Sequence, residues 1–155
     1  MIFVTLGTHE LGFKRMLEYL EKMDIEEEVF IQSGNTEFKS EKYKITQFLS
    51  PSEFEECIEK SDLIITHGGV GSILTALKRK KKVIVMARLQ EYNEHNDNHQ
   101  LEICEKLQKD NYLISCKTFE EFKNAIENYK NIELKEYKFD NSNLLNFISE
   151  TIDSI

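Results

Sequence analysis

The sequence has few of the residues that build disulfide-rich, zinc-binding or membrane-spanning proteins. It contains one proline and three cysteines, Cys57, Cys104 and Cys116, at uneven spacing and without a Cys-x-x-Cys pair. We therefore expect neither a disulfide framework nor a zinc site, and interpret the three as thiols in a reducing compartment. No window approaches the roughly 18 apolar residues that span a bilayer, and the first residues lack the basic segment of a signal peptide.

Positive charge is also in short supply. The chain has 20 Lys and Arg against 28 Asp and Glu, a formal net charge of −8. This balance argues against a nucleic acid partner bound through bulk charge. One basic run, residues 78–82, opposes the overall charge. We interpret it as a solvated helix end; an anionic membrane surface is the alternative partner for it.

The sequence does have enough apolar residues for a core, at 40% of 155 residues. This length suits a single domain over residues 1–155, with 131–155 as a tail and C-terminal helix. Short apolar runs predict strands at 2–6, 28–32, 44–48, 63–66, 82–86 and 112–115. Amphipathic stretches predict helices at 13–23, 51–60, 70–79, 97–109 and 118–128. We also predict a last helix, in which Leu144, Leu145, Ile148, Ile152 and Ile155 would line one apolar face. The alternation predicts an α/β fold, a Rossmann-like parallel sheet flanked by helices.

A glycine-rich loop between a buried strand and a helix is the strongest candidate site. After His67 come Gly68, Gly69 and Gly71, followed by Ser72. Glycines allow close approach of a ligand, and the free N–H groups of a helix start favour a phosphate or diphosphate. The loop is neither a P-loop nor a dinucleotide fingerprint. The alternative is a tight strand-to-helix turn that binds no ligand.

A second polar loop, Gly7, Thr8, His9 and Glu10, follows the first strand. Parallel strands end at one edge of a sheet, so this loop is expected beside the glycine-rich loop if their strands are neighbours. His9 is a candidate base or phosphate donor, and Glu10 a candidate base or a residue that orients His9. The alternative is structural: Thr8 caps the first helix and Glu10 favours its dipole.

A third polar segment, residues 94–100, follows the strand predicted at 82–86. His95 and His99 are four residues apart, but Asp97 is expected to cap the helix and leave His95 outside it. We therefore favour a polar lid or substrate-binding loop over a metal site. Arg88, at the start of this connection, is a candidate partner for a phosphate.

Three motifs together resemble the glycosyltransferase family 28 C-terminal domain. They are residues 3–10, the loop 66–72 and the segment 97–101. The resemblance covers residues 1 to about 130 and is closer still to stand-alone donor-binding subunits of two-component glycosyltransferases. It implies the C-terminal half of a GT-B enzyme that binds a UDP-sugar. A separate, membrane-anchored subunit would bind the lipid-linked acceptor, which would place this chain in the cytoplasm, at the membrane through its partner.

The resemblance also implies roles for individual residues. Gly68, Gly69, Gly71 and Ser72 match the loop that faces the donor diphosphate. His99 and Gln100 match the polar pair near the donor sugar, and Thr75 stands where many relatives have a glutamate for the ribose. Transfer with inversion would need one base, assigned to His9 or Glu10, and no metal or other cofactor.

Three functions follow as hypotheses. The first is an inverting glycosyltransferase subunit that uses a UDP-sugar, with galactose favoured, in capsular or exopolysaccharide synthesis. The second is a non-catalytic nucleotide-sugar-binding subunit that activates its partner. The third is an unrelated Rossmann-type binding module or oxidoreductase, which the single Gly7 of the first loop disfavours.

Overall fold

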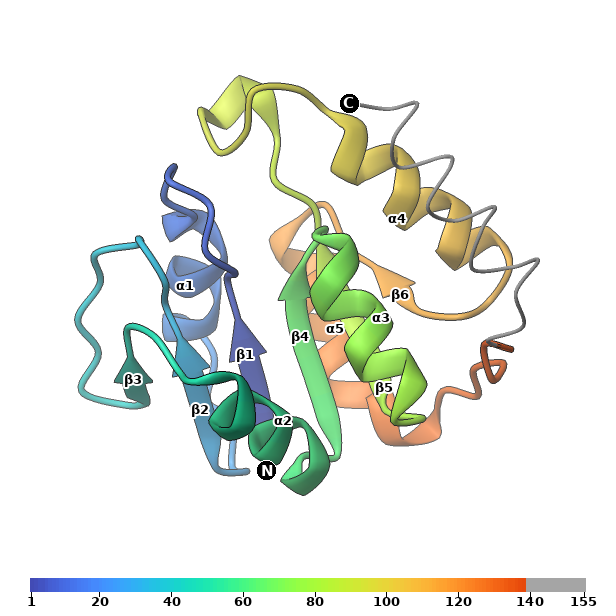
Figure 1. Cartoon of the computed structure of the whole chain (residues 1–155). Coiled ribbons are helices and arrows are strands. Elements are labelled where there is room, and N and C mark those ends of the chain that lie inside the picture. The colour runs from blue at the N-terminus through green and yellow to red at the C-terminus, as the bar shows by residue number, and fades with distance from the viewer. Residues whose placement is uncertain (139–155) are drawn as a thin grey trace.

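A six-stranded parallel sheet forms the centre of the computed structural model, which describes residues 1–138 (Figure 1). The strand order is β3-β2-β1-β4-β5-β6, and every neighbouring pair is parallel. The strands are β1 (Ile2–Thr5), β2 (Val29–Gln32), β3 (Lys44–Thr46), β4 (Leu63–His67), β5 (Lys82–Met86) and β6 (Ile114–Ser115). The predicted Rossmann-like α/β fold is confirmed.

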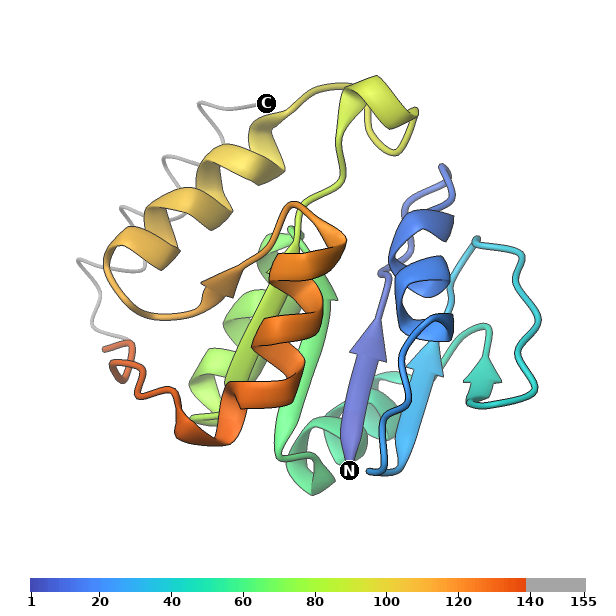
Figure 2. The same cartoon turned by 180° about the vertical axis from the view of Figure 1, so that it is seen from behind.

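Helices cover both faces of the sheet, as the opposite views in Figures 1 and 2 show. One face is covered by α1 (Lys14–Glu21) and α5 (Phe119–Asn128), and the other by α2 (Pro51–Lys60), α3 (Val70–Lys78) and α4 (His99–Lys109). Two short 3₁₀ turns, η1 (Gln90–Tyr92) and η2 (Tyr129–Asn131), complete the described chain. Ser50 caps α2, and Thr118 forms a capping box with Glu121 at α5.

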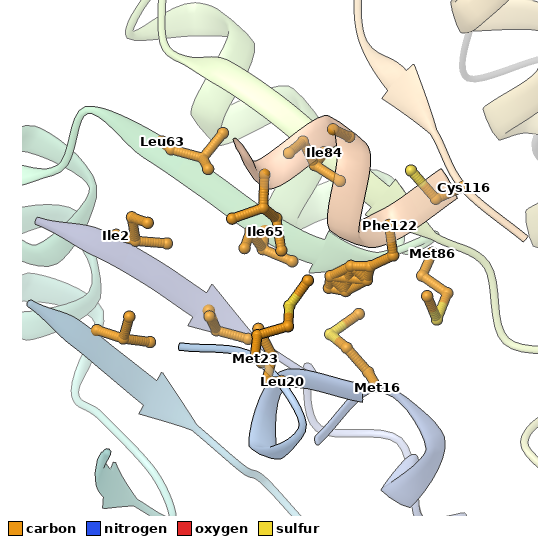
Figure 3. Packing of buried hydrophobic residues seen from close by; sticks show 14 of the residues in the cluster. Ile2, Met16, Leu20, Met23, Leu63, Ile65, Ile84, Met86, Cys116 and Phe122 are labelled. Carbon is orange, nitrogen blue, oxygen red and sulfur yellow. The ribbon is translucent and has the colours of Figure 1, made fainter. Parts of the chain in front are cut away.

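Alternate residues of the central strands supply two separate cores. On the first face, Ile2, Val4 and Ile65 pack against Met16 and its neighbours on α1 and against α5 (Figure 3). On the second face, Phe3, Ile64 and Val83 lie against α2, α3 and α4. Because β1, β4 and β5 are buried on both sides, each contains an unbroken apolar run: 2–4, 63–65 and 83–86.

The elements predicted within the described residues are all present; most have shorter ends, α2 and β5 have the predicted bounds, and β4 ends one residue later than predicted. The prediction that Asp97 caps α4 is wrong: the residue before the helix is Asn98, and its side chain accepts the Gln90 N–H at 2.9 Å instead of capping. Asp97 Oδ1 accepts the N–H of His99 at 3.0 Å. The predicted last helix lies outside the described residues.

The basic run lies at the amino edge of the sheet, because Lys82 begins β5. Its members have local partners. Arg79 pairs with Glu55 and Glu59, Lys80 with Glu136, and Lys82 Nζ donates to the carbonyl of Tyr129 at 2.9 Å. These contacts favour the structural interpretation of the run. No helix within residues 1–138 is both long and apolar enough to cross a bilayer.

Candidate functional site

The glycine-rich loop presents an uncapped helix start at the carboxyl edge of β4. His67 ends β4, Gly69 is the N-cap of α3, and no side chain caps this helix. The first helical hydrogen bond is donated by Ile73 to the carbonyl of Gly69. The N–H groups of Val70, Gly71 and Ser72 therefore have no partner within their own helix. Together with the helix dipole, these donors make a site for an anion.

The three glycines of this loop have different reasons to be glycine. A Cβ at Gly69 would lie 2.1 Å from Cε1 of His67, and one at Gly68 would lie 2.6 Å from Cβ of Gln100. Close packing alone explains these two. A Cβ at Gly71 would meet nothing within 4 Å. Packing does not explain Gly71, so a turn without a ligand accounts for only two of the three glycines.

His67 lies beneath both candidate loops. Its ring is 8% exposed, and a Cβ at Gly7 would approach its Nε2 to 2.3 Å. Gly7 also has a φ of +71°, which favours glycine. Burial, with Arg88 nearby, lowers the pKa of His67 to about 3, against a smaller effect of its hydrogen bond with Gln100. His67 is therefore neutral near pH 7, and its buried Nδ1 has no hydrogen-bond partner within the described chain.

The geometry of His9 decides which of its two predicted roles fits. Its Nδ1 accepts the backbone N–H of Leu11 at 3.0 Å. A neutral imidazole whose Nδ1 accepts carries its proton on Nε2. Burial, then the charges of Arg88 and His95, lower the pKa of His9, which favours the neutral form. His9 is therefore arranged as a hydrogen-bond donor through Nε2, and Glu10, which is exposed, remains as the candidate base.

The structural alternative for the first loop is wrong for Thr8. The first helix begins at Lys14 with Phe13 as its N-cap, so Thr8 lies too far upstream to cap it. Thr8 is exposed, and its carbonyl accepts the side-chain N–H of Asn35 at 3.1 Å. The loop is thus held from outside by Asn35 and from beneath by His67, with Thr8 and Glu10 at the surface.

The prediction that Arg88 contacts a phosphate is wrong in this structure. Its side chain is 1% exposed and donates to backbone carbonyls, including those of Leu6 at 2.6 Å and Leu11 at 2.7 Å. Burial lowers its pKa to about 10, so it remains charged at neutral pH. Arg88 leaves the end of β5, crosses the end of β4 and ties down the loop after β1. It organises the site from below.

The remaining predicted residues lie around the same edge. Gln100 packs under Gly68, and its Oε1 accepts the N–H of Arg88 at 3.1 Å. Ser72 is half-buried in the first turn of α3. Thr75 lies one turn further and donates to the carbonyl of Gly71 at 2.8 Å. His99 begins α4, with its Nδ1 3.6 Å from Oε2 of Glu102.

Sequence reasoning missed the ion pair that supports the loop between β5 and α4. Arg15 donates from Nε and Nη2 to the two carboxylate oxygens of Glu94, at 3.0 and 2.9 Å. The pair joins α1 to this loop, and Glu94 is only 4% exposed. Each residue alone resembles an ordinary surface charge, so no local pattern indicates the pair. Within residues 1–138, no three His, Cys, Asp or Glu side chains are grouped to hold a metal ion.

Several known proteins are similar to this chain. A Candida albicans protein named UDP-N-acetylglucosamine transferase subunit ALG13 is 39% identical over 95 residues, which cover 60% of this chain and 31% of that protein. The human protein of the same name is 33% identical over 79 residues, 51% of this chain and 7% of that protein. The matched regions thus span less than a third of either relative.

Solved structures support the fold. An NMR structure of ALG13 superposes with a TM-score of 0.63 at 22% identity, covering 98% of this chain and 96% of that one. The glycosyltransferase SnogD from Streptomyces nogalater gives 0.55 at 21% identity, over 75% of this chain and 30% of that one. The predicted equivalence to the C-terminal half of a GT-B glycosyltransferase is confirmed. The model of the glycosyltransferase family 28 C-terminal domain matches residues 1–155, and the chain belongs to this family.

Proposed function

We propose that this chain is the donor-binding subunit of an inverting glycosyltransferase that uses a UDP-sugar and no metal. The observation that carries the proposal is the uncapped start of α3, where Gly71 leaves open space above unpartnered amides. A diphosphate suits this place because both its charge and its oxygens match the dipole and the N–H donors. Family membership gives the proposal its reaction class.

The donor sugar that we propose is N-acetylglucosamine. The relatives matched over 95 and 79 residues are both named UDP-N-acetylglucosamine transferase subunits. The expectation of galactose, and of capsular or exopolysaccharide synthesis, has no support from these relatives. Galactose therefore becomes the competing donor in the assay below.

In this proposal, each residue of the site has its own role in the transfer. Amides of Val70, Gly71 and Ser72 bind the diphosphate and stabilise the charge that develops on the leaving UDP. His9 adds its Nε2–H as a further donor, because its Nδ1 is already occupied. The carboxylate of Glu10 takes the proton from the acceptor hydroxyl while that oxygen attacks the anomeric carbon from the face opposite UDP.

A partner subunit completes the enzyme in this proposal. Both matched relatives are named as subunits. We propose that the partner is membrane-anchored and presents a diphospholipid-linked acceptor to the carboxyl edge. This chain then works in the cytoplasm, at the membrane surface through its partner. The alternative is that it only binds the nucleotide sugar and activates a partner that supplies the base.

Reconstitution tests these alternatives. The chain is combined with its cognate membrane fraction, and radiolabelled UDP-N-acetylglucosamine, UDP-galactose and UDP-glucose are compared as donors. Transfer of N-acetylglucosamine, abolished in Glu10→Gln but retained in the exposed-loop control Glu91→Gln, supports a catalytic subunit. Full turnover by Glu10→Gln assigns the base to the partner. Binding of NAD in place of UDP by the isolated chain contradicts the proposal as a whole.

A further inference from the structure

The loop between β5 and α4 reaches across the sheet to the loop after β1. These two strands are not neighbours, because β4 lies between them. The loop carries η1 and lies beyond the carboxyl ends of the strands, at the top of Figure 1. At its far side, the ring of His95 stacks on the ring of His9, with centroids 4.7 Å apart and planes tilted by 33°. Two imidazoles from separate loops thus meet at the proposed donor site.

The base of this loop is closed by Glu94. Its Oε1 accepts the N–H of Leu89 at 3.1 Å, and its own N–H donates to the carbonyl of Leu89 at 3.1 Å. The same carboxylate binds Arg15 on α1. Arg88 adds a bond from Nη1 to the carbonyl of Glu94 at 3.2 Å. The residue next to His95 is therefore fixed by four groups from two elements.

His95 is also held along one edge of its ring. Its Nδ1 lies 3.2 Å from Oδ1 of Asp97 and 3.3 Å from the backbone nitrogen of Asp97. The face of the ring is left to meet His9. Because Leu11 occupies Nδ1 of His9 and His95 covers its ring, rotation of the His9 side chain breaks two contacts at once.

We propose that His95 is a positioning residue for His9, and that the Arg15–Glu94 pair holds His95 in place. By this account His95 touches no substrate. It keeps the Nε2–H of His9 aimed where the diphosphate leaves, so it affects transfer only through His9. The catalytic part of the inference rests on the proposed transferase function, whereas the coupling of the two rings does not.

NMR of the full chain tests the coupling without any substrate. Long-range ¹H–¹⁵N spectra give the tautomer and the pKa of each histidine. The charged groups facing His9 are Arg88, His95, Glu10 and Asp97. We expect wild-type His9 to be the Nε2–H tautomer. In His95→Ala its pKa rises and its tautomers mix, whereas His95→Phe keeps the ring contact and the tautomer.

Two glutamates on the same loop provide matched variants that test the Arg15–Glu94 ion pair. Glu94→Gln removes the charge that binds Arg15, and Glu91→Gln makes the same change at an exposed position. We expect the first to mix the His9 tautomers and the second to leave them unchanged. An unchanged His9 tautomer and pKa in His95→Ala overturns the proposal, and so does an identical effect of the two glutamine variants.

Turnover of the reconstituted enzyme tests whether His95 affects transfer only through His9. We expect His95→Ala to lower kcat by about 10- to 100-fold with little change in KM. The reason is that a misplaced Nε2–H of His9 no longer stabilises the transition state. His95→Phe recovers most of this loss. His9→Ala combined with His95→Ala is no slower than His9→Ala alone. If the losses in kcat of the two single variants multiply in the double variant, the positioning role is overturned. If the wild type transfers no sugar from any UDP-sugar, only the proposed function is refuted.

Discussion

Gly71→Ala separates the binding role of the glycine-rich loop from its folding role. Gly71 is the second residue of α3, and an added Cβ meets no atom within 4 Å. Alanine in a helix is favoured over glycine by about 0.5–1 kcal/mol. The free energy of unfolding is therefore expected to rise by up to that amount, or about 2–4 °C in Tm per kcal/mol for a chain of this size.

The same methyl group occupies the space in which the diphosphate would sit. Loss of one hydrogen bond to a charged group costs about 1.5–3 kcal/mol. That loss corresponds to a Kd for UDP that is roughly 10- to 150-fold higher. Urea denaturation measures the stability and isothermal titration calorimetry with UDP measures the affinity. The variant is thus expected to be at least as stable as the wild type while binding UDP poorly.

Gly69→Ala is the matched control, because its Cβ would lie 2.1 Å from Cε1 of His67. Overpacking of this kind destabilises by about 1–3 kcal/mol. The two substitutions in one loop are therefore expected to change stability in opposite directions. The reasoning is refuted if Gly71→Ala binds UDP with the affinity of the wild type, since the open space would then have no ligand.

Two further predictions concern groups that support the site, Arg88 and His67, and a third concerns a helix cap away from it. Arg88→Leu leaves buried carbonyls without their donor, and is expected to lower the free energy of unfolding by about 3 kcal/mol or more in urea; Arg88→Lys fails to restore it, because lysine lacks the planar fork. The pKa of His67 is about 3 in the folded chain against 6.5 ordinarily. As the pH falls, the unfolded chain therefore takes up the proton first, and the wild type should lose up to about 1.4 kcal/mol per pH unit between about pH 6.5 and pH 3. His67→Gln lacks this slope, and equal slopes in both proteins would count against a buried neutral ring. Thr118→Ala removes the capping box of α5 at a cost of about 1 kcal/mol, without altering UDP affinity.

Local signals in the sequence predicted the fold well. The strands β1, β4 and β5 are recognisable from their unbroken apolar runs, because both their faces are buried. Ser50 and Thr118 cap their helices, as is typical of Ser and Thr directly before a helix. Helix α4 was predicted to begin too early, because Asp97 and Asn98 are equally good caps by residue type. The contact of Asp97 with His95 and that of Asn98 with Gln90 decide which side chain is free to cap, and neither is visible from residue type.

The candidate site was predicted less completely, for a different physical reason. The two loops were found because glycine clusters after strands are a local pattern. The roles of Arg88 and Glu94 depend on partners far along the chain, Leu6 and Arg15. In the sequence, a buried arginine that donates to backbone carbonyls looks the same as an exposed arginine that binds a phosphate. Only the three-dimensional contacts separate these two roles.

Chemical-shift mapping of UDP shows whether the amides at the start of α3 bind the nucleotide. In ¹H–¹⁵N spectra of the full chain titrated with UDP, we expect the largest shifts on Val70, Gly71 and Ser72, the first turn of α3. Shifts confined to Lys80, Lys81 and Lys82 at the opposite edge would contradict it, as would spectra that UDP leaves unchanged.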